Sequence, residues 1–122
     1  MKFYALENAE LYPMDLTAEY SAARSIGSIS IGESHLFYKK FRKVYCVAYS
    51  EIRRCFRRVV LVPMKLCCGG GDMHMENLVV ETEAGEIAQL PLPGERAART
   101  AIDELKKKMP HAEFQAPKTE TE

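Results

Sequence analysis

Residues 78–90 read Leu-Val-Val-Glu-Thr-Glu-Ala-Gly-Glu-Ile-Ala-Gln-Leu and contain the clearest hairpin pattern of the chain. Two apolar runs, Leu78–Val80 and Ile87–Leu90, flank the turn-forming segment Glu83–Glu86. Gly85 lies near the position where a tight hairpin turn requires a positive φ. The pattern therefore predicts a strand, a tight turn and a second strand that pairs with the first.

The residues before this hairpin form further short apolar runs, each bounded by turn residues or by charge. Such runs, rich in β-branched and aromatic residues, are typical of strands. The segment 39–43 is strongly basic and would form the tip of a hairpin, where its charges stay solvated. We expect strands at Ser28–Ile31, His35–Tyr38, Val44–Tyr49 and Cys55–Val62.

A helix is expected after the hairpin. Pro91 and Pro93 end the second strand, and four apolar residues then recur at i, i+4, i+7 and i+11, which defines one face of a helix. Lysines near its end complement the helix dipole, and Pro110 marks its stop. The apolar face, which we expect to cover an opening in the sheets, consists of Ala98, Ile102, Leu105 and Met109.

The two ends of the chain have weaker patterns. Leu16, Tyr20 and Ala23 recur at helical spacing, so a short helix is expected from Asp15 to Arg24. For the first dozen residues, a helix and an arm both remain open. We divide the chain into an N-terminal helical arm at 1–25, one domain at 26–114 and a flexible tail at 115–122.

The balance of charges leaves the chain as a whole with no net electrostatic attraction to nucleic acid or to an anionic membrane. Seventeen basic and seventeen acidic residues give a formal net charge of zero, so any attraction to an anionic partner needs a local patch. No apolar run approaches the ~20 residues that span a bilayer, and the N-terminus lacks the apolar core of a signal peptide. We therefore expect a cytoplasmic protein with no transmembrane segment, whose four cysteines are free thiols.

The order of strands and helix resembles the pleckstrin-homology-like (PH-like) fold, and more closely the small bacterial PH-like domains. The resemblance covers about 26–114. It implies an α+β, mainly β protein: a partial barrel of two near-orthogonal antiparallel sheets with about six or seven strands, capped by the C-terminal helix. The extra N-terminal helix is an addition to that pattern. The segments that carry the resemblance are Ile29–Glu33, Val47–Ile52, Asn77–Thr82 with Gly85, and Ala98–Met109.

A PH-like fold does not by itself settle function, and we interpret the chain as a non-enzymatic interaction module that binds a protein partner or forms a homo-oligomer. A sheet edge left by an incompletely closed barrel can add a strand from another chain. The alternative is an anionic ligand or acidic lipid headgroup, because related eukaryotic domains bind phosphoinositide headgroups with basic side chains around an early hairpin. The candidate anionic-ligand patch consists of Lys39, Lys40, Arg42, Lys43 and Arg57, of which Arg57 shares a strand face with Arg53 but not with Arg54 or Arg58.

Other chemistry has less support from the sequence. Adjacent Cys67 and Cys68 suit a zinc site poorly, even with His74, His35 or Asp72 to complete it. The glycines of the Cys67–Asp72 loop lack the spacing of a nucleotide-binding loop, and the chain contains no nucleophile elbow. We expect no catalytic residue, metal or cofactor.

Aromatic residues also alternate with basic ones, a pattern that single-stranded nucleic-acid surfaces share. Aromatic residues in strands are usually core, and the zero net charge opposes such a partner. We expect no nucleic acid to bind. The aromatic residues concerned are Phe37, Tyr38, Phe41, Tyr45 and Tyr49.

Overall fold

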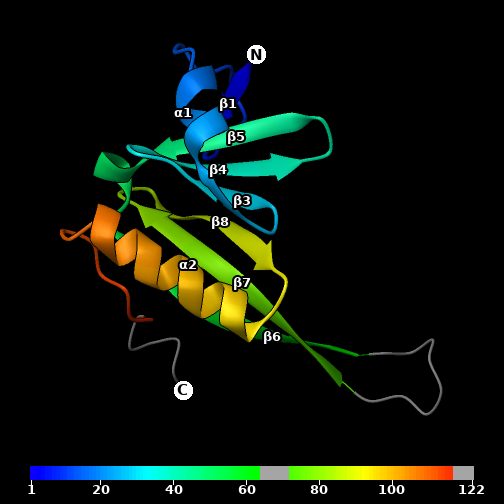
Figure 1. Ribbon diagram of the computed structural model, residues 1–122. Coiled ribbons are helices and arrows are strands. Elements are labelled where there is room, and N and C mark those ends of the chain that lie inside the picture. Colours follow the sequence, from blue (N-terminus) through cyan, green and yellow to red (C-terminus); the bar gives the residue numbers. More distant parts are fainter. Residues whose placement is uncertain (64–71, 117–122) are drawn as a thin grey trace.

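The computed structural model describes residues 1–63 and 72–116, with the side chains at 62, 63, 72 and 73 excepted (Figure 1). The chain is mainly β and forms two sheets, with strand orders β1-β5-β4-β3-β2 and β6-β7-β8. A C-terminal helix, α2, packs beside them. The predicted α+β, mainly β class is confirmed, and within the described residues the two sheets do not close into a barrel.

The five-stranded sheet includes the N-terminus of the chain. Its strands are β1 (Phe3–Ala5), β2 (Arg24–Ile26), β3 (Ile29–Ile31), β4 (His35–Lys40) and β5 (Lys43–Ala48). The neighbours among β2 to β5 pair antiparallel, but β1 pairs parallel to β5, with Phe3 opposite Val44.

The segment 1–25 thus differs from a purely helical arm. The helix expected there exists as α1 (Thr17–Ala22), but the same segment also supplies β1 and most of β2. The physical reason is burial, because Phe3 is only 1% exposed in its place beside β5. With β1 included, residues 1–63 and 72–116 contain eight strands, more than the expected six or seven, and one parallel pairing between named strands.

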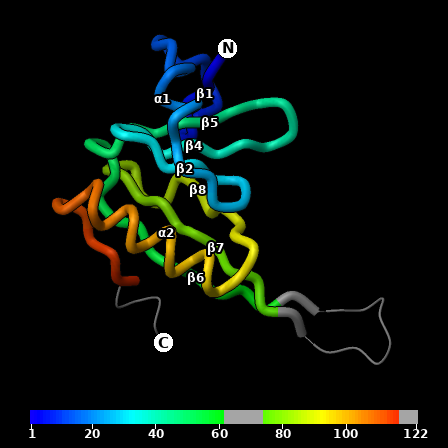
Figure 2. The backbone as a smooth tube through the Cα atoms, viewed as in Figure 1, coloured from blue at the N-terminus to red at the C-terminus, as the bar shows by residue number. Residues whose placement is uncertain are grey.

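The second sheet contains the hairpin that the sequence predicts most clearly. After a short 3-10 helix, η1 (Tyr49–Glu51), it runs through β6 (Arg54–Pro63), β7 (Asp72–Thr82) and β8 (Gly85–Leu92). Gly85 has a φ of 98°, as the turn between β7 and β8 requires. Because β8 ends opposite Glu76, β6 and β7 continue beyond it as a two-stranded ribbon (Figures 1 and 2).

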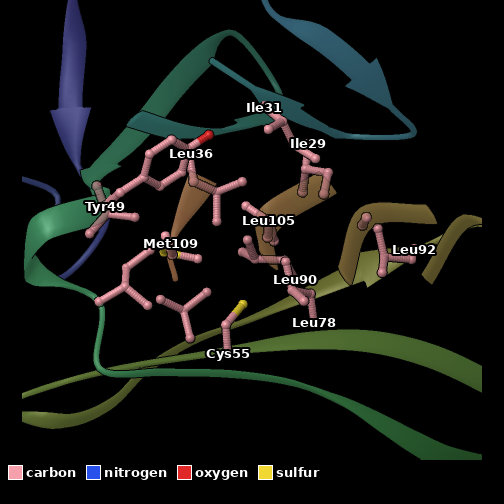
Figure 3. Packing of buried hydrophobic residues seen from close by; sticks show 14 of the residues in the cluster. Ile29, Ile31, Leu36, Tyr49, Cys55, Leu78, Leu90, Leu92, Leu105 and Met109 are labelled. Atoms are coloured by element: carbon pink, nitrogen blue, oxygen red, sulfur yellow. The ribbon is translucent and has the colours of Figure 1, made fainter. Parts of the chain in front are cut away.

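The main core lies between the two sheets and α2 (Glu95–Lys108) (Figure 3). Ile29 and Leu36 come from the first sheet, Leu78 and Leu90 from the second, and Leu105 from the helix. The expected apolar stripe of α2 is correct at three of its four positions, since Ala98, Leu105 and Met109 are fully buried. Ile102 is only half-buried, and Ala101 is buried in addition.

A second, smaller core covers the opposite face of the five-stranded sheet. It contains Phe3, Phe37, Val44 and Cys46 from the strands and Leu16 from the residue before α1. The N-terminal segment therefore protects a sheet face that would otherwise expose apolar side chains to water.

A carboxylate attaches α1 to this sheet. Glu19 Oε2 accepts hydrogen bonds from the backbone N–H groups of Ser34 (2.9 Å) and His35 (2.8 Å), and Glu19 Oε1 accepts one from Ser34 Oγ (2.8 Å). A Cβ added at Gly32 would lie 2.5 Å from Glu19 Oε2, so a larger residue at position 32 would displace the carboxylate from these hydrogen bonds. Partial burial raises the pKa of Glu19, but the hydrogen bonds from Ser34 and His35 outweigh it, and the net pKa is lowered.

Leu105→Ala is expected to lower the free energy of unfolding by about 2–5 kcal/mol, because it leaves a cavity where α2 closes the core. Urea unfolding followed by circular dichroism measures this change. The exposed Lys107→Ala on the same helix should stay within about 0.5 kcal/mol of the native chain. Equal effects of the two substitutions would contradict the position of the core.

Glu19→Gln is expected to lower the free energy of unfolding by about 2–3 kcal/mol at pH 7, because charged acceptors make the stronger hydrogen bonds. Since folding lowers the pKa of Glu19, its contribution is complete above the ordinary glutamate value of about 4.3 and disappears as the pH falls through the lower folded value. The difference between native and variant chains should therefore shrink below about pH 5. Urea unfolding from pH 7 to pH 3, with the exposed Glu7→Gln as control, tests this, and a constant difference would refute it.

Candidate functional site

The turn between β4 and β5 brings four of the five predicted patch residues together. Phe41 and Arg42 form a two-residue turn, and Lys40 lies directly opposite Lys43. All four cations are exposed, and none of them forms an ion pair within the part of the chain that the structure describes. We call Lys39, Lys40, Phe41, Arg42 and Lys43 the hairpin tip.

Phe41 is the unusual residue of the hairpin tip. Its φ is 57°, a left-handed conformation that costs an L-residue about 1–2 kcal/mol relative to glycine. Its side chain is 88% exposed, the highest exposure among the large apolar residues described as exposed. Both features oppose folding stability, and retained strain of this kind is characteristic of functional positions.

The cations occupy both faces of the hairpin. Because side chains alternate along a strand, Lys40 and Lys43 share one face, whereas Lys39 points to the other. Like charges directly opposite each other are destabilising, so the pair Lys40 and Lys43 opposes the hairpin unless an anion is near. Lys43 Nζ lies 5.0 Å from the ring centroid of Tyr4, a cation–π contact that fixes the lysine behind the turn.

Three half-buried tyrosines lie behind the hairpin tip. Tyr38 on β4 faces Tyr45 on β5, with ring centroids 6.4 Å apart, and Tyr4 on β1 lies 6.1 Å from Tyr45. They lie on the sheet face that also bears Lys40 and Lys43. Tyrosine rings with one apolar and one polar end suit the boundary between water and a less polar phase.

Arg57, the fifth predicted patch residue, lies in the other sheet. It forms a bidentate ion pair with the buried Glu76, and its Nη2 lies 3.5 Å from Glu95 Oε1. The hydrogen bond from Arg57 lowers the pKa of Glu76 despite the desolvation of that carboxyl. Arg57 therefore already has carboxylate partners, in contrast to the cations of the hairpin tip.

The other three arginines of this region also have acidic partners. Arg53 contacts Glu83, Arg54 lies 2.6 Å from Glu113 and Arg58 lies 3.0 Å from Glu86. The arginines of this region are therefore paired with acidic side chains, whereas the four cations of the hairpin tip form no ion pair within residues 1–63 and 72–116.

Ser34, His35 and Glu19 have the composition of a hydrolytic triad but not its geometry. Ser34 Oγ (2.9 Å) and Glu19 Oε1 (3.2 Å) both contact His35 Nδ1, whereas His35 Nε2 lies 3.3 Å from Tyr12 Oη. Nucleophilic activation needs the hydroxyl and the carboxylate on opposite ring nitrogens. The cluster therefore joins α1 to the β3–β4 turn and does not form a proton relay.

Two of the four cysteines, and the histidines considered as metal ligands, lie within the described residues. Burial raises the pKa of the Cys46 and Cys55 thiols to about 12, so both are protonated at neutral pH and are poor nucleophiles. Cys67 and Cys68 lie outside the described residues. His35 is buried, His74 is exposed, and residues 1–63 and 72–116 contain no group of three side chains suited to hold a metal ion.

The sequence predicted the position of the basic turn correctly but did not single out Phe41 and Tyr4. An apolar residue between Lys40 and Arg42, in a turn of only two residues, was the available signal for Phe41. The neighbourhood of Tyr4 had no such signal, because the β1–β5 pairing joins residues far apart in the chain. In the described part of the chain, no helix has the length and apolarity needed to cross a bilayer.

Comparisons with known proteins complete the description of the site. No family model, curated protein or solved structure matches this chain. The PH-like resemblance therefore rests on the order of the elements alone, and the candidate site rests on its own geometry.

Proposed function

We propose that this chain is a non-enzymatic interaction module that docks on anionic membrane surfaces through the hairpin tip. The observation that carries the proposal is a strained, 88% exposed Phe41 next to four cations that form no ion pair with the residues that the structure describes. An aromatic ring that enters the headgroup region, with lysines and arginines beside it, is the combination by which peripheral elements bind acidic lipids.

A planar surface suits the hairpin tip better than a single small anion. A site for one phosphate gathers its donors around one point, whereas Lys39 points to the opposite face from Lys40 and Lys43. A membrane presents many headgroups and can engage both faces of the hairpin at once. It would also relieve the repulsion between Lys40 and Lys43.

The expected energies are sufficient for reversible docking. Each lysine or arginine near an acidic leaflet contributes about 1 kcal/mol, and burial of a phenylalanine side chain contributes about 1.5–3 kcal/mol. The tyrosines behind the tip would then lie at the level of the interface, where such side chains are favoured.

A PH-like architecture remains part of this proposal. Two sheets that share one core with a C-terminal helix are consistent with it. The parallel strand β1 is an addition to the pattern, as is α1. In this reading β1 brings Tyr4 beside Lys43 and extends the docking surface.

The native chain is expected to co-sediment with vesicles of phosphatidylcholine containing about 30% phosphatidylserine, and not with phosphatidylcholine alone. Lys40→Ala together with Lys43→Ala should weaken binding by about 2 kcal/mol, or roughly thirtyfold, and binding should fall with added salt. Lys106→Ala with Lys107→Ala removes the same charge from α2 and is the matched control. Equal losses in both double variants, or displacement by millimolar inorganic phosphate, would reject docking through the hairpin tip.

Phe41→Asn is expected to change stability and membrane binding in opposite directions. Asparagine tolerates a positive φ, so the free energy of unfolding should rise by about 0.5–1 kcal/mol. The same substitution removes the apolar group that enters the interface, so vesicle binding should weaken about fivefold or more. Urea unfolding and vesicle co-sedimentation of one preparation measure both effects, and a variant that binds as well as the native chain would exclude a role for Phe41.

A further inference from the structure

The outer edge of β6 is an unusually open part of the fold. Cys55 N–H donates to Glu113 O, and Glu113 N–H donates to Arg53 O, both at 2.9 Å, so the N–H of Cys55 and the C=O of Arg53 point away from β7, whereas Arg53 N–H donates to Glu81 O on β7 at 2.8 Å. From Cys55 onward, alternation along the strand makes the odd-numbered residues the outward ones. Because the β6–β7 register continues unbroken to Pro63, the N–H and C=O groups of Arg57, Val59 and Leu61 also point outward. Among residues 1–63 and 72–116, none of these six groups forms a backbone hydrogen bond.

The strand that forms this open edge also carries exposed apolar side chains. Val59 is 44% exposed and Leu61 is 57% exposed, and both lie on the same face of the two-stranded ribbon. The sequence from Val59 to Val62 contains no charge. Proteins normally protect a long edge strand with lysine, proline, a bulge or a covering segment, and an unprotected apolar edge is a site for adding another strand.

Other sheet edges in the structure are protected or short. β8, the opposite edge of the same sheet, contains Pro91, which lacks an N–H group. β1 is bridged by Leu11, and β2 has only three residues. Strand addition is therefore most favourable at β6.

We infer that β6 pairs antiparallel with β6 of a second copy of this chain, with Val59 opposite Val59 of the other copy. Two boundaries fix this register. Glu113 already occupies the edge at Cys55, and Pro63 has no N–H to donate, so the usable edge is centred on Val59. The two three-stranded sheets then form one continuous six-stranded sheet across the dimer.

The charge pattern favours a second copy as the occupant. In the Val59-centred register Arg57 faces Leu61 and Arg58 faces Val60, so no like charges meet, and both arginines keep their glutamate partners. The zero net charge of the chain gives weak repulsion between copies. The dimer is independent of membrane docking, because the hairpin tip belongs to the other sheet.

Sedimentation velocity over a range of concentrations tests the dimer. The native chain should show a concentration-dependent dimer, and Val59→Pro should raise its dissociation constant by about ten- to hundredfold, because it removes both symmetric N–H donors. Val59→Pro keeps the β6–β7 ladder, since residue 59 bonds outward, and circular dichroism verifies the fold. His74→Lys, on the same ribbon but one strand away, is the control. A native chain that stays monomeric, or a dimer that survives Val59→Pro, would overturn the inference.

Disulfide trapping tests the register in a chain that carries Cys67→Ser and Cys68→Ser. Val59→Cys should cross-link two copies under mild oxidation, because directly opposed hydrogen-bonded residues have Cα atoms about 5.5 Å apart, within disulfide range. Leu61→Cys should not cross-link, because Leu61 faces Arg57 of the other copy. Cross-linking at 61 without cross-linking at 59 would overturn the register and with it the proposed dimer.

Discussion

The packing of α2 against both sheets is the contact on which the rest of the structure depends. Neither a three-stranded nor a five-stranded sheet can bury one apolar face alone, and the two sheets share a single core that α2 completes with Ala98, Ala101 and Leu105. This arrangement fixes the inner face of each sheet. It also determines which parts of the strands extend beyond the core, and these are the β4–β5 hairpin tip and the β6–β7 ribbon.

The two extensions differ in chemistry because their sequences differ beyond the core. The hairpin tip carries four cations and one aromatic ring, whereas the outer part of β6 carries consecutive aliphatic residues and open backbone groups. The first combination suits a phase boundary with negative charge, and the second suits another strand. The zero net charge of the chain conceals the basic hairpin tip, because the arginines of β6 have glutamate partners while the cations of the tip form no ion pair within the described residues.

Local patterns in the sequence were sufficient for α2, for the β7–β8 hairpin and for the position of the basic turn, because each depends on residues close together in the chain. Non-local contacts were not accessible in this way. The parallel pairing of Phe3 with Val44 joins two short segments with no recognisable spacing between them. The ion pair between Arg57 and Glu76 is also a contact between residues far apart in the chain. The sequence could not reveal it, so the candidate patch included an arginine whose charge is neutralised in the fold.

Phe41 shows why a site can be visible in the sequence and still be misread. Aromatic residues near strands are usually core, and the sequence pattern groups Phe41 with Phe37, which is fully buried. Only the two-residue length of the turn separates them, because it forces residue 41 to the outside with a positive φ. Glycine or asparagine would satisfy that backbone more easily, so the choice of phenylalanine is unfavourable to the isolated fold. Such a choice is consistent with a side chain whose environment is supplied by a partner outside the chain.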